Sequence, residues 1–394
     1  MKAVVLAAGE GKRLRPFTET LPKVMLTIAN KPIIRYVIDA LEKTQIDEII
    51  IVVGYKKEVI MEYFKDYKKT KITFVNQDKQ LGTAHALLQA KNKIKGPFIV
   101  LAGDNIIDNN SISKLISEKS QYSILIKEHP HPSKYGVVFT EQEKLKKIIE
   151  KPKEEIGRFI STGIYKLPKT IFKTIEELSK KGKYKLTESV QSILNKGEKI
   201  STIIADDWMD IVYPWDLIIV NEIMISKTSS SKGGTIEKNV TIKGKVSIGK
   251  DAKIYSGSYI VGPVIIGKGC EIGPNACIFP STSIGDNTVI YPNSEIRNCV
   301  VGKDCHIGSN SFIENTVLGR NVILKNNFSC SSGDNIIKIE DEFNEINNIG
   351  ALIGEDCTIG NNVVVDPGVI IGRKCNIDSM KRIRKNLESS SKVM

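Results

Sequence analysis

The chain has 394 residues, of which 41% are apolar and 26% are charged, a composition typical of globular proteins with two or three domains. It carries no apolar run long enough to span a membrane and no signal peptide before its first predicted strand, so we expect a cytoplasmic protein without a membrane partner. The formal net charge of +12 comes from scattered lysines and not from a basic patch interleaved with aromatic side chains, which argues against a nucleic-acid partner and favours anionic small molecules.

The N-terminal half alternates short apolar runs with amphipathic stretches. The apolar runs predict buried strands, at residues 2–8, 48–53, 72–75, 98–102 and 122–126. The amphipathic stretches predict helices, at about 33–44, 56–68, 83–93, 110–120, 170–181, 186–196 and 214–225. Alternating strands and helices form a mostly parallel sheet covered on both faces, and ligands bind beyond the carboxyl ends of its strands. The sequence therefore predicts an α/β, doubly wound, Rossmann-like domain.

A glycine-rich turn follows the first predicted strand. It comprises Gly9–Arg13 (GEGKR) and is followed by Pro22 and Lys23. Such a turn allows backbone N–H groups to approach a phosphate, and a nearby arginine and lysine can neutralise it. The sixth position from Gly9 is Leu14, so the turn is neither the GxGxxG of dinucleotide-binding oxidoreductases nor a Walker A loop. A plain strand–helix turn with solvated cations is the alternative interpretation.

The C-terminal half repeats with a period of six residues. Eleven isoleucines fall on every sixth residue, at 236, 242, 248, 254, 260, 266, 272, 278, 284, 290 and 296. A small residue follows each of them four positions later, for example Val240, Ala252 and Ala276. This period fits neither a helix nor a simple strand, and it predicts a hexapeptide-repeat parallel β-helix. Glycine often follows the large residue, as at Gly249 and Gly267, where we expect a corner that needs backbone freedom.

Three segments depart from this repeat. The stretch Ser226–Gly234 (SKTSSSKGG) has the composition of a linker, so we predict an N-terminal domain over 1–225, a linker over 226–235 and the β-helix over 236–378. Residues 331–350 interrupt the hexads and should loop out. The polar residues 379–394 are predicted to cap the last coil as a short helix and then to fray.

All seven cysteines lie beyond residue 269. Four of them occupy the small-residue position of a hexad and are predicted to be small core residues: Cys270, Cys305, Cys357 and Cys375. The odd count and the absence of a CxxC pair argue against a disulfide framework and against a zinc site.

A series of motifs runs through the N-terminal part in a fixed order. They are LAAGEGKRLRPFTETLPK, QDKQLGTAHA, Gly103-Asp104, Tyr135-Gly136, Glu150-Lys151-Pro152, STGIY at 161–165 and DDWMDIVYPWDL. Together they resemble the sugar-1-phosphate nucleotidylyltransferase family over about residues 1–225, with the base-reading segment in its uridylyltransferase form. With the β-helix attached, the whole chain resembles archaeal bifunctional N-acetylglucosamine-1-phosphate uridylyltransferase/glucosamine-1-phosphate acetyltransferases.

The resemblance implies roles for particular residues of this chain. The catalytic cations would be Arg13 and Lys23, and Mg²⁺ would be held by Asp104 and Asp210. The nucleotide-binding residues that it implies are Ala7, Ala8, Gly9, Gly11, Gln77, Gly82 and Thr83. The sugar-phosphate-binding residues that it implies are Gly136, Glu150, Lys151 and Thr162. For Asp104, the residues alone leave a second interpretation, the N-cap of the helix predicted at 110–120.

The expected reaction transfers a nucleotidyl group from an NTP, with UTP or dTTP favoured, to glucose-1-phosphate or N-acetylglucosamine-1-phosphate and releases pyrophosphate. The attacking phosphate oxygen is already anionic, so the reaction needs positioning and charge neutralisation more than a general base. The alternative is a non-catalytic regulatory or scaffold subunit. Such subunits tend to lose the loop arginine, the lysine or a metal carboxylate, and this chain retains all of them. Ser161 stands where the family often has asparagine, which leaves the sugar open.

The resemblance also implies that the β-helix is left-handed, assembles as a trimer or another homo-oligomer and, in many relatives, acetylates a sugar with acetyl-CoA. The family has His and Tyr where this chain has Ser309 and Phe312. His306 lies three residues earlier and precedes the inward Ile307, so its side chain should point outward. Acyl transfer to an amine needs a base. A second, acetyl-CoA:glucosamine-1-phosphate acetyltransferase activity and a β-helix that only assembles subunits therefore both remain open.

Overall fold

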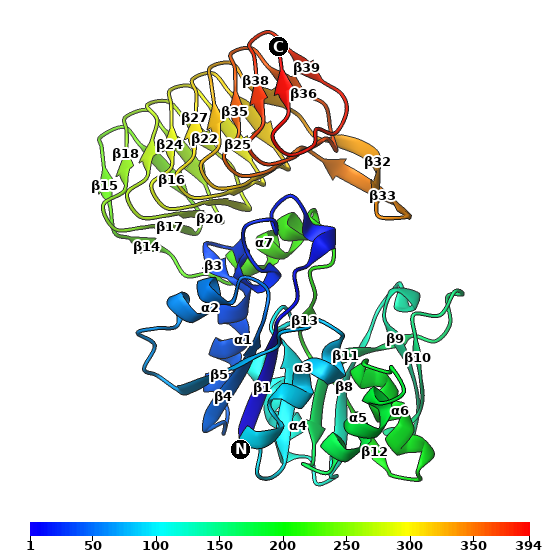
Figure 1. Ribbon diagram of the computed structural model, residues 1–394. Coiled ribbons are helices and arrows are strands. Elements are labelled where there is room, and N and C mark those ends of the chain that lie inside the picture. Colours follow the sequence, from blue (N-terminus) through cyan, green and yellow to red (C-terminus); the bar gives the residue numbers. More distant parts are fainter. The chain divides into compact units, whose positions relative to one another are not determined.

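The computed structural model describes all 394 residues (Figure 1). Its contacts divide the chain into two compact units. The α/β unit comprises Met1–Glu10, Leu21–Met25 and Pro32–Asp210. The β-helix unit comprises Gly11–Thr20, Leu26–Lys31 and Ile211–Met394. Three segments that precede residue 225 therefore pack with the β-helix, and the domain boundaries drawn from linker composition stay a prediction.

The α/β unit is built on a nine-stranded sheet with the order β5-β4-β1-β6-β11-β8-β12-β10-β9. Its strands are β1 (Lys2–Ala7), β4 (Glu48–Val53), β5 (Lys71–Asn76), β6 (Phe98–Ala102), β8 (Tyr122–Glu128), β9 (Gly136–Glu141), β10 (Lys144–Glu150), β11 (Phe159–Leu167) and β12 (Ile200–Ile204). The five predicted strands are all present. The strands β1, β4, β5 and β6 are parallel, whereas β11 runs antiparallel to β6 and β8. The sheet is therefore mixed where the sequence predicted a mostly parallel one.

Helices cover both faces of this sheet, as predicted. On one face are α1 (Ile33–Glu42), α2 (Lys57–Tyr63) and α4 (Asn109–Ser117), and on the other are α3 (Thr83–Gln89), α5 (Ile171–Ser179) and α6 (Leu186–Asn195). Ile34, Val37 and Leu41 recur at helical spacing on α1 and pack in one core with Val5 of β1, while Val4 faces the other core. No helix of the structure is long and apolar enough to cross a membrane.

The β-helix is formed by three parallel sheets (Figure 1). The first contains β14 (Ser231–Lys232), β17 (Val246–Ile248), β20 (Val264–Ile266), β23 (Thr282–Ile284), β26 (Val300–Val301), β29 (Val317–Leu318), β34 (Leu352–Ile353) and β37 (Ile370–Ile371). The second contains β15 (Thr235–Ile236), β18 (Lys253–Ile254), β21 (Glu271–Ile272), β24 (Val289–Ile290), β27 (His306–Ile307), β30 (Ile323–Leu324), β35 (Thr358–Ile359), β38 (Asn376–Ile377) and β40 (Lys392–Val393). The third contains β16 (Thr241–Lys243), β19 (Tyr259–Val261), β22 (Cys277–Ile278), β25 (Glu295–Arg297), β28 (Phe312–Glu314), β31 (Ser329–Cys330), β36 (Val364–Val365) and β39 (Arg382–Ile383).

The register of these sheets explains the six-residue period. Ile248 pairs with Ile266, and Ile266 with Ile284, so each coil uses three hexads and stacks like on like. These isoleucines are at most 1% exposed. The predicted hexapeptide-repeat parallel β-helix is thereby confirmed. The four cysteines in small-residue positions are likewise at most 1% exposed, which confirms their core role.

Most of the glycines that follow a large residue serve a different purpose from the one predicted. Gly249 does not have a positive φ; instead, a Cβ at Gly249 would come within 2.6 Å of the backbone of Gly267 on the next coil. Many left-handed corner positions are taken by Asn or Asp, for example Asn287 and Asp304 with φ of 58° and 57°. Asn and Asp tolerate this conformation better than most residues do. Gly249 is therefore required by close stacking of the coils, whereas Gly273, with φ of 98°, has the backbone freedom that was predicted.

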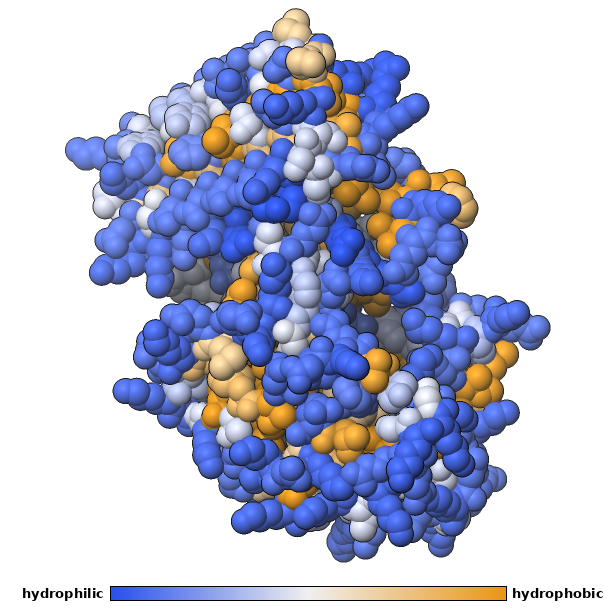
Figure 2. Space-filling model, viewed as in Figure 1, coloured by the Kyte–Doolittle hydropathy of each residue, from blue (hydrophilic) through white to orange (hydrophobic).

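The interruption at 331–350 is an antiparallel hairpin of β32 (Gly333–Ile339) and β33 (Glu342–Ile349), so the predicted loop-out is confirmed. Ile336 and Phe343 on it are 60% and 73% exposed, and Figure 2 shows an apolar patch at this hairpin. The short helix predicted in the tail is wrong. β39 and β40 extend two of the sheets instead, because Ile383 and Val393 continue the inward positions of the repeat.

The helix α7 (Asp216–Ser226) packs on the side of the β-helix. Asn221, which is fully buried, accepts from the backbone N–H of Ala29 at 2.9 Å and donates to the carbonyl oxygen of Ser281 at the same distance. It also accepts from the hydroxyl of Ser283 at 2.8 Å. The side-chain amide of Asn221 thus joins α7, the segment Leu26–Lys31 and β23. These hydrogen bonds explain why α7 and Leu26–Lys31 belong to the β-helix unit.

Candidate active site

Three charged side chains converge beyond the carboxyl ends of the parallel strands. Asp104 follows β6, and Asp210 follows β13 (Trp208–Met209), which pairs with β7 (Ile106–Ile107) and so returns the chain to the neighbourhood of Asp104. Lys23 lies in a short 3-10 turn, η2 (Lys23–Met25). Its ammonium group forms an ion pair with Asp104 and lies 3.4 Å from Oδ1 of Asp210. We call these three residues the charged triad.

The charged triad is shielded from solvent and carries a net negative charge. The side chains of Lys23, Asp104 and Asp210 are 16%, 20% and 18% exposed. Burial alone would lower the pKa of Lys23, but the two carboxylates outweigh it and raise that pKa above its ordinary value. The lysine is therefore firmly protonated. Two carboxylates against one ammonium leave a charge of about −1, which favours an additional cation.

The charged triad fits Mg²⁺ by its donor chemistry. Mg²⁺ takes oxygen ligands and is commonly bound by one or two carboxylates together with substrate phosphates, without an all-protein cage. Asp104 and Asp210 supply two such carboxylates facing a common cation, and no group of three or more His, Cys, Asp or Glu side chains is arranged to hold a metal alone. The N-cap alternative for Asp104 is wrong, because Asp108 caps α4 by accepting from the N–H of Ser111 at 2.8 Å.

Asn105, beside the charged triad, was not singled out by the sequence patterns. It is 4% exposed, and its Oδ1 has no hydrogen-bond partner. This oxygen faces the backbone of Gly163, where an added Cβ would lie 3.9 Å away. An unpaired buried acceptor costs free energy, so its presence next to Asp104 indicates a position prepared for a donor. Its only sequence signal is its place directly after the metal carboxylate.

The predicted base-reading segment surrounds a buried amide. Gln77 follows β5 and is 4% exposed; its Nε2 donates to Nδ1 of His85 at 2.9 Å and lies 3.4 Å from the carbonyl oxygen of Gly82. Gly82 has φ of 152°, and a Cβ there would lie 2.6 Å from the carbonyl oxygen of Tyr184. The hydroxyl of Thr83 accepts from the backbone N–H of Leu186 at 3.0 Å. Donation by Nε2 leaves Oε1 of Gln77 to accept from a ligand.

The predicted sugar-phosphate segments lie on neighbouring strands of the same unit. Gly136 and Glu150 are directly paired between β9 and β10, and the N–H of Lys151 donates to the carbonyl oxygen of Tyr135 at 3.0 Å. Lys151 has φ of 45°, an uncommon conformation for a lysine. Thr162 is 2% exposed and its hydroxyl donates to the carbonyl oxygen of Leu125 at 2.7 Å, so its side chain is engaged within the sheet.

The glycine-rich turn is shared between the two compact units. Ala7, Ala8 and Gly9 belong to the α/β unit, whereas Gly11 and Arg13 belong to the β-helix unit. Gly11 has φ of 75°, and its carbonyl oxygen accepts from the N–H of Leu14 and from the hydroxyl of Thr18, both at 2.9 Å. A left-handed residue thus closes the turn, which is a reason for glycine at this position.

Arg13 is engaged by the hairpin that interrupts the β-helix. Its Nε donates to Glu340 at 3.0 Å, and its Nη2 lies 3.7 Å from Glu342. The hydroxyl of Tyr213 donates to Glu342, and the guanidinium lies 5.9 Å from the ring of Tyr213. Burial alone would lower the pKa of Arg13, but these carboxylates raise it. The two carboxylate partners lie over 300 residues away, so no local pattern could have predicted them.

The residues considered for acetyl transfer lie on the outer surface of the β-helix. Ile307 is fully buried, and His306 beside it faces outward, as predicted. The hydroxyl of Tyr291, one coil earlier, lies 3.5 Å from Nδ1 of His306, and the two rings stack 6.2 Å apart. Phe312 is in register with Ser329 on the next coil and lies near the guanidinium of Arg297.

Comparison with protein families matches residues 2–226 to Nucleotidyl transferase, residues 242–333 to the GMPPB C-terminal domain and residues 350–385 to the Bacterial transferase hexapeptide (six repeats). The Bifunctional protein GlmU of Methanococcus maripaludis is 35% identical and aligns over all of this chain and 97% of its own length. The Bifunctional sugar-1-phosphate nucleotidylyltransferase/acetyltransferase of Sulfurisphaera tokodaii is 35% identical over 96% of both chains.

A solved structure resembles the N-terminal part. It is a Bacillus anthracis protein described as a glucose-1-phosphate thymidylyltransferase in complex with sucrose, with 25% identity, a TM-score of 0.53, and coverage of 59% of this chain and 98% of its own. The family resemblance drawn from the motifs is thereby confirmed. By the match over residues 2–226 and by relatives that align along its whole length, this chain belongs to the nucleotidyl transferase family and is a transferase with a hexapeptide-repeat β-helix.

Proposed function

We propose that this protein transfers a nucleotidyl group from an NTP to a sugar 1-phosphate, glucose-1-phosphate or N-acetylglucosamine-1-phosphate, and releases pyrophosphate. The observation that carries the proposal is the convergence of Lys23, Asp104 and Asp210 beyond the sheet. Two multiply charged phosphates must meet in this reaction, and a dry, pre-positioned set of charges is the feature that lowers such a barrier. The printed names of the relatives support the same reaction class.

Each member of the charged triad has a role in this proposal. When bound between Asp104 and Asp210, Mg²⁺ would supply charge neutralisation and orient phosphate oxygens. Lys23, freed from its ion pair, then donates to the phosphates that become pyrophosphate, where negative charge grows as the α-phosphorus bond breaks. The predicted second cation for these phosphates is Arg13. The oxygen of the sugar phosphate attacks as an anion, which agrees with the absence of a histidine from the charged triad.

The rest of the α/β unit would bind the two substrates. The backbone of Ala7–Gly11, with Gln77, Gly82 and Thr83, is assigned to the nucleotide; Gly136, Glu150, Lys151 and Thr162 are assigned to the sugar phosphate. Because the hydroxyl of Thr162 is engaged in the sheet, its contact would come from the backbone. The unpaired Oδ1 of Asn105 is assigned to accept from a hydroxyl of the sugar. A non-catalytic subunit would not need this set, so the enzyme is favoured over a regulatory role.

We expect UTP and dTTP to be used in preference to ATP and GTP, because Oε1 of Gln77 can accept from the N3–H of a uracil or thymine. Replacing Gln77 by alanine should lower the preference for UTP over ATP by about 1–3 kcal/mol, roughly 5- to 150-fold in kcat/KM. Pyrophosphate release measured with all four nucleotides checks this. Gln89→Ala removes a glutamine that contacts His85 from the next turn of α3 and is the matched control. Equal rates with four nucleotides in the parent would contradict the base-reading assignment.

A second, acetyl-CoA-dependent activity of the β-helix toward glucosamine-1-phosphate is supported by the printed names of relatives that align along the whole chain. The outward pair His306 and Tyr291 is the observation that favours it here, since an amine acceptor must lose a proton to a base. With Ser309 and Phe312 in place of the family's His and Tyr, we expect acetyl transfer by the parent to be slow. The β-helix would also carry the homo-oligomer, a trimer or a multiple of one.

If His306 is that base, His306→Ala should strongly lower the remaining acetyl transfer and leave nucleotidyl transfer at the parental rate. The loss is expected to be on the order of a hundredfold, the usual contribution of a general base. Coenzyme A release with glucosamine-1-phosphate measures one activity and pyrophosphate release the other, on the same protein. Acetyl transfer at the parental rate in His306→Ala would exclude this histidine, and no transfer in the parent would leave the β-helix as an assembly element.

A further inference from the structure

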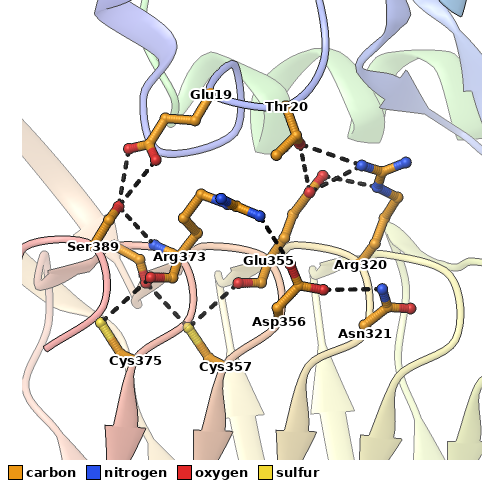
Figure 3. A network of polar contacts seen from close by, with 11 residues as sticks. Glu19, Thr20, Arg320, Asn321, Glu355, Asp356, Cys357, Arg373, Cys375 and Ser389 are labelled. Carbon is orange, nitrogen blue, oxygen red and sulfur yellow. Dashed lines mark hydrogen bonds and ion pairs between the residues drawn. The ribbon is translucent and has the colours of Figure 1, made fainter. Parts of the chain in front are cut away.

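The β-helix holds the loop that carries Arg13. This loop, Gly11–Thr20, belongs to the β-helix unit, and three of its side chains contact coils or insertions that lie 300 residues or more later in the chain. Arg13 contacts the hairpin, Glu19 accepts from the hydroxyl of Ser389 at 3.0 and 3.1 Å, and Thr20 enters a charged cluster on the coils (Figure 3). We call this segment the Arg13 loop.

The cluster is centred on one buried carboxylate. Glu355 is 5% exposed and receives two hydrogen bonds from Arg320, from Nε at 2.8 Å and from Nη2 at 2.9 Å. The hydroxyl of Thr20 donates to Glu355 and accepts from Nη2 of Arg320 at 3.2 Å (Figure 3). A bidentate arginine–carboxylate pair is among the most directional contacts in proteins, and Thr20 is fixed by both partners of it.

The geometry of the coils brings these two side chains together. Leu318 pairs with Ile353, and Arg320 and Glu355 each follow two residues after that pair, at the same corner of adjacent coils. The hairpin inserted between these coils separates the pair by 35 residues in sequence without disturbing the stacking. At the equivalent corners of earlier coils stand the exposed residues Lys268 and Asp286, so burial of a carboxylate is peculiar to the coil that meets the Arg13 loop.

A short chain of contacts connects this anchor to Arg13. Thr18, which is fully buried, donates to the carbonyl oxygen of Gly11 at 2.9 Å and so ties the end of the loop to its beginning. The N–H of Leu14 donates to the same oxygen and completes the turn that contains Arg13. Displacement of Thr20 would therefore be transmitted over two residues to Thr18 and from there to the backbone on which Arg13 stands.

We propose that Glu355 and Arg320 of the β-helix are positioning residues for nucleotidyl transfer, which hold the Arg13 loop through Thr20. They touch no reacting atom; they fix the loop that carries Arg13, the predicted second cation for the phosphates. The inference rests on the proposed function, because it assigns the anchor to that reaction. It gives the β-helix a part in the chemistry of the N-terminal motifs, in addition to assembly.

The test uses the full chain and an almost isosteric change, Thr20→Val, which removes the hydroxyl and leaves the buried pair of Glu355 and Arg320 intact. Removing Glu355 itself would leave Arg320 unpaired and destabilise the coils. We expect kcat/KM for UTP to fall about tenfold, the effect of losing one well-placed hydrogen bond, while KM for the sugar phosphate stays unchanged. Hydrogen–deuterium exchange of the peptide covering 11–20 should become faster. Thr20→Ser, which restores the hydroxyl, should recover both properties.

Asp366→Asn provides the matched control, because it weakens an exposed arginine–carboxylate pair with Arg382 at 2.8 Å on the same β-helix. It should change neither the kinetics nor the exchange of the Arg13 loop. An active parent in which Thr20→Val leaves the kinetics unchanged would overturn the proposal, whether or not exchange becomes faster. A parent that releases no pyrophosphate with any nucleotide would instead refute the proposed function on which the inference rests.

Discussion

Replacing Asp104 by asparagine is expected to lower the turnover of nucleotidyl transfer by about three orders of magnitude, or ~4 kcal/mol of transition-state stabilisation. The change keeps the shape of the side chain and removes the charge that would hold Mg²⁺ with Asp210. The fold should be retained, because Lys23 keeps its contact with Asp210 at 3.4 Å. The measurement is kcat from pyrophosphate release over a titration of Mg²⁺, with thermal unfolding measured in parallel.

The matched control is Asp206→Asn, which also neutralises one carboxylate of the α/β unit. Asp206 forms an exposed ion pair with Lys114 at 2.8 Å, so neither the fold nor the turnover should change. Asp104→Asn with near-parental turnover at saturating Mg²⁺ would remove Asp104 from the metal site. Equal losses in both variants would point to a general effect of losing a carboxylate and not to a metal ligand.

Replacing Lys23 by alanine is expected to lower kcat by roughly a hundredfold to a thousandfold, the range found when one charge-stabilising donor is removed from an active site. The effect should fall on kcat, because the lysine is assigned to charge that grows on the departing pyrophosphate. Steady-state kinetics with UTP and a sugar phosphate measure it. A higher KM with unchanged kcat would mean that Lys23 only binds the ground state.

The pH dependence of this lysine has a definite sign. Its folded pKa is raised above the ordinary value of 10.5, so its stabilising contribution is fully present below that pH and is lost only as the pH rises through the higher folded value. Lys23 therefore contributes no titration to activity or stability between pH 6 and 9. Lys114→Ala removes an exposed ion pair with Asp206 at 2.8 Å and serves as the control for loss of a lysine. Its effect on kcat should be negligible.

The β-helix was predictable because every coil requires the same pattern of residues. A large apolar residue must recur at each inward position, and Ile248, Ile266 and Ile284 show the resulting register directly. The tail was mispredicted because its polar residues hide two inward positions, Ile383, which keeps the six-residue spacing from Ile377, and Val393, which does not. In the α/β unit, β9, β10, β11 and β12 were not predicted. In β10 the sequence KLKKIIE mixes lysines with the apolar residues that make a strand recognisable.

The candidate site was predictable where a motif is local and was missed where the partner is distant. Asp104 and Asp210 came from motifs over 100 residues apart, and the pairing of β7 with β13 brings them together. The contacts of Arg13 with Glu340, and of Thr20 with Glu355, link a turn near the start of the chain to the last coils. Nothing in the spacing of a single sequence encodes such pairs, because they depend on how the coils stack.

The most direct test of the central claim is a product analysis of the full chain incubated with UTP, Mg²⁺ and either glucose-1-phosphate or N-acetylglucosamine-1-phosphate. Pyrophosphate is quantified and the nucleotide sugar is identified by mass spectrometry, with Asp104→Asn run alongside. We predict equal amounts of pyrophosphate and UDP-sugar for at least one of the two acceptors, no release without an acceptor, and loss of both products in the variant. No UDP-sugar from either acceptor with UTP or dTTP, or undiminished formation in Asp104→Asn, would contradict the proposed nucleotidyl transfer at the charged triad.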